Sequence, residues 1–267
     1  MSSDSIDPRW RRVAEEAARA AGRVAVAARG RVTVSSKGLR DVVTEADYAA
    51  QAAVKGIIGA AFPDHAFLAE EKDATPGGAS DLTWVIDPID GTTNYSHGVP
   101  LFCTSIALTR GGESLVGVVY DPLRDEMYAA VKGQGATLNG VSIQVSGRDR
   151  LIDAIVGIEW ASPQDLRVDS LRRLAPLGEQ VMTIRSPGAA ALSLAYVALG
   201  CFDLYFNVHL QPWDTAAAAL MIREAGGRVT GLRGEPWRLD SGGILASNGR
   251  LHDAALGVWG ISPSTSP

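Results

Sequence analysis

The stretch that most constrains the fold of this chain is residues 84–94, which read Trp-Val-Ile-Asp-Pro-Ile-Asp-Gly-Thr-Thr-Asn. Residues 84–86 are apolar and β-prone, which predicts the end of a buried strand. Asp87 and Asp90 follow directly, with Pro88 between them. Because proline has no N–H to donate, we expect the hydrogen-bond ladder of the strand to stop there. The pattern therefore predicts two carboxylates at the carboxyl end of a strand.

Gly91 permits a tight turn after these carboxylates, and Thr92 or Thr93 can begin a helix. Carboxylate oxygens can hold a hard divalent cation, and the free N–H groups of a turn that leads into a helix can hold a phosphate. An acidic surface turn is the alternative interpretation, because Asp-Pro and Asp-Gly pairs are common in such turns. The local pattern leaves both interpretations open.

The composition limits the class of protein. The chain has 267 residues, of which 46% are hydrophobic and 21% charged, as expected of a soluble globular protein of one large domain or two modest ones. A net charge of −5 and a pI near 5.4 argue against a nucleic-acid surface. We find no apolar run long enough to span a membrane and no signal peptide, so we expect no membrane partner and a cytoplasmic location. Cys103 and Cys201 lie in apolar runs, which predicts two buried free thiols.

The beginning of the chain predicts two helices. Apolar residues at helical spacing indicate an amphipathic helix over residues 8–30, and we expect residues 31–43 to form a short extended piece and a flexible loop. Thr44 and Asp47 fit a capping box that opens a helix over residues 45–61. Asp47 either only caps this helix or also points into a functional site, and a carboxylate has enough lone pairs for both.

Carboxylates also follow a second short apolar run. Residues 66–69 read Ala-Phe-Leu-Ala, and Glu70 and Glu71 come directly after them, as Asp87 follows its own strand. Two strands that end in this way are expected to bring their carboxylates together at one edge of a sheet. A further acidic residue, Asp214, is expected in the first turn of a helix, where the helix dipole alone would favour an aspartate.

Beyond residue 94 the pattern is first β and then alternates between strand and helix. Expected strands cover residues 104–109, 115–120, 126–131, 155–158, 181–184 and 202–208, and two more lie between 228 and 247. Expected helices cover residues 163–174, 212–225 and 249–257. A further helix is expected to begin with Ser186 and Pro187 as its cap and to end at Gly200. Residues 133–147 are Gly-rich and are expected to end the first half. We therefore predict an α/β fold with an α+β half over residues 1–147 and an α/β half over residues 148–267.

Four blocks of the sequence together carry a family resemblance. They are Thr44-Glu45-Ala46-Asp47, Ala69-Glu70-Glu71, Asp87-Pro88-Ile89-Asp90-Gly91-Thr92-Thr93-Asn94, and Pro212-Trp213-Asp214 with Glu224-Ala225-Gly226-Gly227 after it. In this order they resemble the inositol monophosphatase family of magnesium-dependent, lithium-sensitive phosphatases, and the resemblance covers nearly the whole chain. It implies a layered αβαβα sandwich of the inositol monophosphatase and fructose-1,6-bisphosphatase type, usually a homodimer. Residues 1–147 would carry most metal ligands, and residues 148–267 would carry Asp214 and the substrate pocket.

The resemblance assigns a metal site to the matching positions. Glu70, Asp87 and the carbonyl group of Ile89 resemble the ligands of a first Mg²⁺. Asp87 would bridge to a second Mg²⁺ held by Asp90 and Asp214, and a weaker third ion is often held near Glu70. The implied cofactor is therefore two Mg²⁺ ions, or three.

The resemblance also implies the reaction, in which a metal-activated water attacks phosphorus directly and no covalent phosphoenzyme forms. Thr92 and Asp47 resemble the pair that orients this water, the N–H groups of Gly91 and Thr92 resemble the phosphate site, and Lys37 resembles a mobile-loop lysine near the metals. Catalytic roles are thus implied for Asp47, Glu70, Asp90 and Thr92, and substrate contacts for Lys37, Asp90, Gly91, Thr92, Gly188, Ala189, Ala190, Asn207 and Asp214.

Electrostatics supports a metal site independently. In such a fold Asp47, Glu70, Asp87, Asp90 and Asp214 would lie close together. Two unit charges about 4 Å apart repel by about 4 kcal/mol at an effective dielectric constant of about 20, so gathered carboxylates would protonate or spread apart unless cations held them. Mg²⁺ prefers oxygen ligands, and it would also neutralise a phosphate and lower the pKa of a bound water.

The substrate pocket departs from the family pattern. Family members that act on inositol phosphate often carry a glutamate seven residues before the Trp-Asp aspartate, where it accepts a hydrogen bond from a ring hydroxyl. That position is Asn207 here, and an amide can bond a hydroxyl only without charge. The Gly-Thr-Ala stretch that often lines the pocket reads Gly188-Ala189-Ala190.

Three functions follow from these patterns. The first is a phosphomonoesterase, an inositol-phosphate phosphatase that hydrolyses inositol 1-phosphate or a similar small polyol or sugar phosphate, and we adopt it. The second keeps this chemistry but acts on fructose 1,6-bisphosphate, histidinol phosphate, a 3′-phosphonucleotide or a biosynthetic intermediate, and Asn207 keeps it open. The third is a regulatory protein that has kept the fold, which the intact carboxylate set argues against. A glycosidase also uses paired carboxylates but has no need of the Gly-Thr-Thr phosphate turn.

Overall fold

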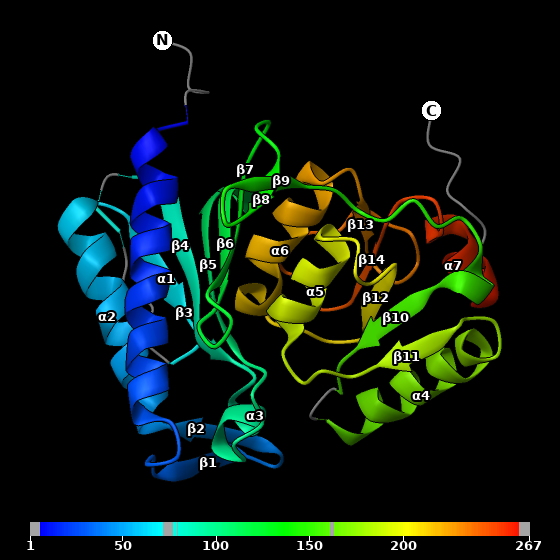
Figure 1. The fold of residues 1–267 in the computed structure, drawn as a ribbon, viewed down its shortest axis with the longest axis horizontal. Coiled ribbons are helices and arrows are strands. Elements are labelled where there is room, and N and C mark those ends of the chain that lie inside the picture. Colours follow the sequence, from blue (N-terminus) through cyan, green and yellow to red (C-terminus); the bar gives the residue numbers. More distant parts are fainter. Residues whose placement is uncertain (1–5, 72–76, 79, 161–162, 262–267) are drawn as a thin grey trace.

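The computed structural model describes residues 6–71, 77–78, 80–160 and 163–261, which form five alternating layers of helices and sheets (Figure 1). The layers are, in order, helices α1 (Pro8–Ala28) and α2 (Glu45–Ala61), a seven-stranded sheet, helices α5 (Ala190–Ala198) and α6 (Pro212–Glu224), a five-stranded sheet, and helices α4 (Gln164–Gly178) and α7 (His252–Val258). This order confirms the α/β class and the expected αβαβα sandwich.

The seven-stranded sheet carries the acidic motif. Its strands, in spatial order, are β3 (Ala66–Ala69), β4 (Leu82–Asp90), β5 (Cys103–Arg110), β6 (Glu113–Asp121), β7 (Glu126–Val131), β8 (Ala136–Leu138) and β9 (Val141–Ile143). Strands β3 and β4 are parallel, and Ala69 pairs with Ile86. The carboxylates that follow these two residues therefore meet at one edge of the sheet, as expected.

The five-stranded sheet has the order β11 (Thr183–Arg185), β10 (Ile155–Ile158), β12 (Leu204–Asn207), β14 (Ile244–Ser247) and β13 (Arg228–Thr230). Strands β11, β10 and β12 are parallel, and β14 is antiparallel to both of its neighbours. Side chains alternate between the two faces. On β12, Leu204 and Phe206 belong to the core beneath α4 and α7, whereas Tyr205 belongs to the core around α5 and α6.

The two middle helices are packed between sheets on both sides. Residues 215–222 of α6 are all buried, and many of them are alanines. Gly117 on β6 allows this close approach, because a Cβ atom there would lie 2.5 Å from the carbonyl oxygen of Ala217. The tight packing fixes the direction of α6 and hence the position of Asp214 in its first turn. No helix in the described ranges is long and apolar enough to cross a membrane.

Strand β4 does not end at Pro88, where we expected its ladder to stop. The strand continues to Asp90, and its register against β5 shifts, because Asp87 pairs with Ser105 and Asp90 with Cys103. Three steps on β4 thus face two on β5, which is a bulge, and a bulge is a place where a strand tolerates proline. The bulge keeps both carboxylates on one paired strand.

Two helix boundaries also differ from expectation. Helix α5 begins at Ala190 and not beside Pro187, because Gly188 adopts φ +84°, a left-handed conformation that does not continue into a helix. Helix α4 runs from Gln164 to Gly178, past its expected end, and includes Pro176 in its last turn.

The sequence also predicted two loops and the exposure of one cysteine incompletely. The expected flexible loop before α2 is a hairpin of β1 (Val34–Gly38) and β2 (Asp41–Thr44). The Gly-rich residues 133–147 contain the short strands β8 and β9, which continue the sheet beyond β7. Cys201 is exposed rather than buried, because it lies in the bend that follows α5, whereas Cys103 is buried as expected. The boundary between residues 147 and 148 stays a prediction.

Candidate metal centre

Three carboxylates converge where β4 ends and α6 begins. Asp87 and Asp90 lie on β4 and Asp214 lies in the first turn of α6, and one carboxylate oxygen from each lies within 4.8 Å of the others. Asp87 is 2% exposed and Asp90 is 7% exposed. Two buried carboxylates and one half-buried carboxylate, more than a hundred positions apart in the sequence, therefore form one acidic group, which we call the acidic cluster.

Burial and mutual repulsion both disfavour the charged forms of these acids. Burial, and then the charges of Glu70, Asp90 and Asp214, raise the pKa of Asp87 well above its ordinary value. Burial and the charge of Asp90 raise the pKa of Asp214 in the same way. A divalent cation would remove this penalty, and a set of oxygen donors is what Mg²⁺ prefers. The residues present therefore fit Mg²⁺.

Backbone N–H groups orient each member of the acidic cluster. The N–H of Ile89 donates to Asp87 Oδ1 at 3.0 Å, and the N–H of Gln211 donates to Asp214 Oδ2 at 2.8 Å. The second contact belongs to the capping box of α6, so the local sequence signal that begins the helix also aims this carboxylate.

Asp90 is held by residues at the start of α5. The N–H groups of Ala190 and Ala191, at the start of α5, donate to Asp90 Oδ1 and Oδ2 at 3.0 and 2.8 Å. The thiol of Cys103 lies 3.4 Å from Asp90 Oδ2. Burial raises the pKa of Asp90, and these donors oppose that shift. The start of α5 therefore fixes a carboxylate of β4.

Glu70 lies beside the acidic cluster and forms an ion pair with Lys37. The Lys37 Nζ atom is 2.9 Å from Glu70 Oε1 and 2.7 Å from Glu71 Oε1. Burial lowers the pKa of Lys37, but the two glutamates more than offset this effect and the net shift is upward. Since Lys37 lies on β1, the hairpin of β1 and β2 reaches the edge of the site.

Asp47 caps α2 and also reaches toward the site. Its Oδ2 atom accepts hydrogen bonds from the N–H and the hydroxyl of Thr44 at 2.8 and 2.6 Å. Its Oδ1 atom lies 3.3 Å from Thr92 Oγ1, which in turn lies 3.0 Å from the carbonyl oxygen of Ile89. The predicted pair of Thr92 and Asp47 is therefore in contact.

The turn after β4 packs against the start of α5. Gly91 has φ +94°, and a Cβ atom there would lie 3.0 Å from the carbonyl oxygen of Gly188 and 3.2 Å from Ala189 Cβ. The side chain of Asn94 donates to the carbonyl oxygen of Pro187 at 2.7 Å. The structure thus brings Gly188, Ala189 and Ala190 beside the Gly91 turn, and any other residue at position 91 would be strained.

Two cavities open beside the acidic cluster. One, of about 540 Å³, is lined by Asp90, Asp214, Gly188 and Ala190 together with Arg40, Thr93, Asn94, Glu159, Trp160, Arg167, Ser186 and Leu210. We call it the Glu159 cavity. The other, of about 560 Å³, is lined by Lys37, Glu70 and Asp214 together with Asp41, Trp160, Pro163, His209, Leu210, Gln211 and Trp213. Because Asp214 lines both, the cavities meet at the acidic cluster.

Sequence reasoning missed Glu159, which the structure places in the wall of the first cavity. Glu159 comes directly after the strand at residues 155–158, so the signal that singled out Glu70 and Asp87 would also have found it. Arg40, Trp160 and Arg167 carried no comparable signal, because exposed arginines and aromatic residues are common on surfaces.

Asn207 lies inside the protein and is not among the described residues that line either cavity. It is 2% exposed, its amide nitrogen donates to the carbonyl oxygen of Glu159 at 3.1 Å, and its amide oxygen accepts from the N–H of His209 at 2.9 Å. Its contact with a substrate stays a prediction.

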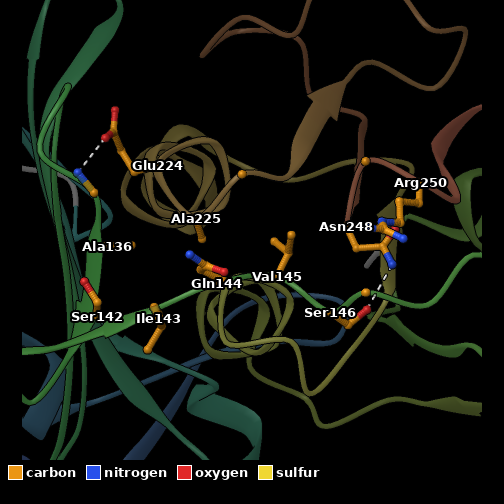
Figure 2. Close-up of a pocket in the computed structure, with 14 residues that line it drawn as sticks. Ala136, Ser142, Ile143, Gln144, Val145, Ser146, Glu224, Ala225, Asn248 and Arg250 are labelled. Atoms are coloured by element: carbon orange, nitrogen blue, oxygen red, sulfur yellow. Dashed lines mark hydrogen bonds between the residues drawn. The ribbon is translucent and has the colours of Figure 1, made fainter.

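A larger cavity, of about 920 Å³, lies at the opposite end of α6 (Figure 2). Glu224 is the one acid among the described residues that line it, and its two oxygens accept hydrogen bonds from the N–H groups of Gly133 and Gly135, each at 2.8 Å. Asp214 and Glu224 are separated by about 15 Å along the helix axis. This cavity therefore lies apart from the acidic cluster and has no comparable set of metal ligands among its described residues.

Comparisons with known proteins show the family of this chain. The sequence profile of the "Inositol monophosphatase family" matches residues 8–259. "Inositol monophosphatase 2" of Solanum lycopersicum is 38% identical over 252 residues, which are 91% of this chain and 95% of the relative. "Nus factor SuhB" of Pseudomonas aeruginosa is 40% identical over 253 residues, 91% of this chain and 93% of the relative. The solved structure of inositol monophosphatase from Anabaena (Nostoc) sp. PCC 7120 aligns with a TM-score of 0.85 and 36% identity over 96% of this chain and 97% of that one. The chain therefore belongs to the inositol monophosphatase family.

Proposed function

We propose that this protein is a Mg²⁺-dependent phosphomonoesterase that hydrolyses inositol 1-phosphate or a similar small polyol or sugar phosphate. The convergence of Asp87, Asp90 and Asp214 carries the proposal. Buried carboxylates in such a group need a cation, and a phosphate ester needs the same positive charge to be bound and hydrolysed. Membership of the family supports the same chemistry.

The proposed ligands come from two strand ends and one helix start. Glu70, Asp87, Asp90 and Asp214, with the carbonyl oxygen of Ile89, would hold two Mg²⁺ ions, and a third ion would lie near Glu70. Bound there, Mg²⁺ supplies the positive charge that acidifies a bound water and stabilises the phosphoryl and leaving oxygens.

The protein's own groups orient the reactants. Asp47 Oδ1, which lies 3.3 Å from the Thr92 hydroxyl, accepts its hydrogen bond and leaves the lone pairs of Thr92 Oγ1 free to accept from the attacking water. The N–H groups of Gly91 and Thr92 receive phosphate oxygens, and the leaving polyol occupies the Glu159 cavity beside Gly188 and Ala190. A cavity of about 540 Å³ is large enough for a small sugar phosphate.

The test is phosphate release from inositol 1-phosphate, fructose 1,6-bisphosphate, histidinol phosphate and a 3′-phosphonucleotide, each with and without Mg²⁺. The Asp90→Asn variant serves as the control for metal-dependent chemistry. We expect Mg²⁺-dependent release with a preference for inositol 1-phosphate. A preference for another ester would keep the chemistry and change the substrate, whereas no release from any of them would contradict the proposal and favour a regulatory protein.

The assembly and location belong to the same proposal. We expect the protein to work as a homodimer, as the family resemblance implies, and we expect it in the cytoplasm. Sedimentation of the purified protein tests the first expectation, and a monomer at micromolar concentration would contradict it.

A further inference from the structure

Glu159 is an acidic side chain that the proposed chemistry leaves unused. It follows β10, where Val156 and Ile158 face the core beneath α4 and α7, so the alternation of the strand directs Glu159 toward α5 and the acidic cluster. It lines the same cavity as Asp90 and Asp214. The carboxyl group therefore borders the space where the leaving group of a substrate would lie.

Three donors hold the Glu159 carboxylate in one orientation. Ser193 Oγ donates to Oε1 at 2.9 Å, and the N–H of Gly188 and the hydroxyl of Ser186 donate to Oε2 at 2.8 and 3.3 Å. An ionised carboxylate has about four lone-pair sites, so at least one remains for a ligand. Because these contacts fix the side chain in advance, a ligand that uses the remaining site pays little entropy to order it.

Asn207, on the neighbouring strand, is not available for the same task. Ile158 pairs with Phe206 in the parallel ladder, so Glu159 and Asn207 stand side by side at the ends of β10 and β12. Both polar groups of the Asn207 amide are already bonded within the chain. Of these two neighbours, Glu159 is the one that lines the cavity.

The chemistry of a carboxyl group selects its partner. Burial raises the pKa of Glu159 to about 8, and its hydrogen bonds to Ser193 and Gly188 oppose the shift. A second anionic group would be repelled by the ionised form and by nearby Asp90. A hydroxyl group can donate to the ionised form and can also accept from the neutral one, so it suits either protonation state.

We propose that Glu159 determines substrate specificity by hydrogen-bonding a hydroxyl group of the leaving polyol, and so selects phosphate monoesters of polyols and sugars over esters whose leaving group has no hydroxyl. This inference rests on the proposed phosphatase function. It names Glu159, rather than Asn207, as the side chain that recognises the polyol.

The test compares inositol 1-phosphate with p-nitrophenyl phosphate, whose leaving group carries no hydroxyl group. At a pH above about 8, where the Glu159 carboxyl is ionised, we expect kcat/KM for inositol 1-phosphate to fall by roughly 10- to 100-fold in Glu159→Leu, as loss of a hydrogen bond to a charged group predicts. The Glu159→Gln variant, which keeps the shape and a neutral hydrogen bond, should lie between it and the wild type. Hydrolysis of p-nitrophenyl phosphate and inhibition by inorganic phosphate should stay unchanged in both variants.

The matched control is Glu224→Gln, which alters a carboxylate that also accepts backbone hydrogen bonds but lies at the other end of α6. It should leave the ratio of the two kcat/KM values unchanged. An equal loss on both substrates in the Glu159 variants would overturn the proposal, because it would assign Glu159 a role in holding α5. No loss on either substrate would overturn it as well.

The wild-type protein separates this inference from the proposed function. Mg²⁺-dependent hydrolysis of p-nitrophenyl phosphate without any hydrolysis of polyol or sugar phosphates would keep the metal chemistry and overturn the specificity proposal. If no ester is hydrolysed in the presence of Mg²⁺, the proposed phosphatase function itself is wrong.

Discussion

The two ends of helix α6 surround their acidic side chains in opposite ways. At the C-terminal end, Glu224 has two backbone N–H donors, from Gly133 and Gly135. At the N-terminal end, Asp214 has one such donor and faces the carboxylates of Asp87 and Asp90. Backbone N–H groups of the chain thus stabilise the charge of Glu224, whereas the acidic cluster requires a cation to stabilise its charges.

This difference separates stability from function. A carboxylate that the protein itself satisfies contributes to folding, and its removal leaves unpaired donors. Carboxylates that repel one another oppose folding until a cation binds, and their removal costs function instead. The four predictions below test this comparison, from the largest expected effect to the smallest.

The largest effect is expected for Asp214→Asn. The substitution removes a negative ligand, and we expect turnover to fall by roughly 100- to 1000-fold, as for loss of a group that stabilises transition-state charge. The amide oxygen can still accept from the N–H of Gln211, and repulsion within the acidic cluster decreases. The melting temperature of the metal-free protein should therefore not fall. A folded variant with near-wild-type turnover would contradict the assignment of Asp214 as a ligand.

His252 extends the comparison to a buried base. It is 0% exposed and bonds Ser247 Oγ and Thr230 Oγ1, each at 2.8 Å. Burial, and then the charge of Arg228, lower the pKa of His252 to about 4. Since an unfolded histidine has a pKa of about 6.5, the unfolded chain binds more protons between these values. The free energy of unfolding should fall by roughly 3 kcal/mol as the pH drops through this range.

Denaturant titrations between pH 7 and pH 4 measure this loss. His252→Asn should be less stable at pH 7, because the smaller amide makes poorer contacts, but it should lose less stability on acidification. An equal pH dependence in the variant and the wild type would show that other groups cause the acid sensitivity.

Mg²⁺ should stabilise the folded protein directly. At a concentration about 100 times its Kd, a ligand that binds only the folded state adds about 2.7 kcal/mol to the free energy of unfolding. In a chain of this size that corresponds to a rise in Tm of roughly 5 to 10 °C. Thermal melts after EDTA treatment, with and without added Mg²⁺, measure the shift. The shift should shrink in Asp214→Asn and persist in Glu224→Gln, and a shift equal in all three proteins would place the ion elsewhere.

The smallest effect is expected for Glu224→Gln. The glutamine can accept only one of the two backbone hydrogen bonds, so we expect a loss of about 1 to 2 kcal/mol in the free energy of unfolding. Turnover should stay within about twofold of the wild type, because the site lies about 15 Å away along α6. A loss of turnover without a loss of stability would break the comparison between the two helix ends.

Local sequence signals predicted much of the site. The capping box at Thr44 and Asp47 gave helix α2 at residues 45–61. The carboxylates after β3 and β4 meet at one sheet edge because these strands are parallel, as their shared pattern suggested. The bulge at Pro88 escaped prediction, since proline signals a break in hydrogen bonding but not whether pairing resumes after it.

The substrate side of the site depended on tertiary structure. Whether Glu159 or Asn207 faces the cavity is decided by the pairing of β10 with β12 and by the packing of α5 above them, and neither is a local property of the sequence. Likewise, the ion pair of Lys37 with Glu70 and Glu71 depends on where the β1–β2 hairpin lies relative to the residues that follow β3.

The sequence by itself determined the order of helices and strands and the acids that follow two of the strands, because hydrophobic period, capping and strand-end carboxylates are local patterns that each element carries with it. The layered arrangement was expected from the family resemblance, not from any one of these local patterns. Only the tertiary structure decided which polar side chains share the cavity with those acids. Exposure and hydrogen-bond partners arise when elements far apart in the sequence pack together, and no single segment encodes that outcome.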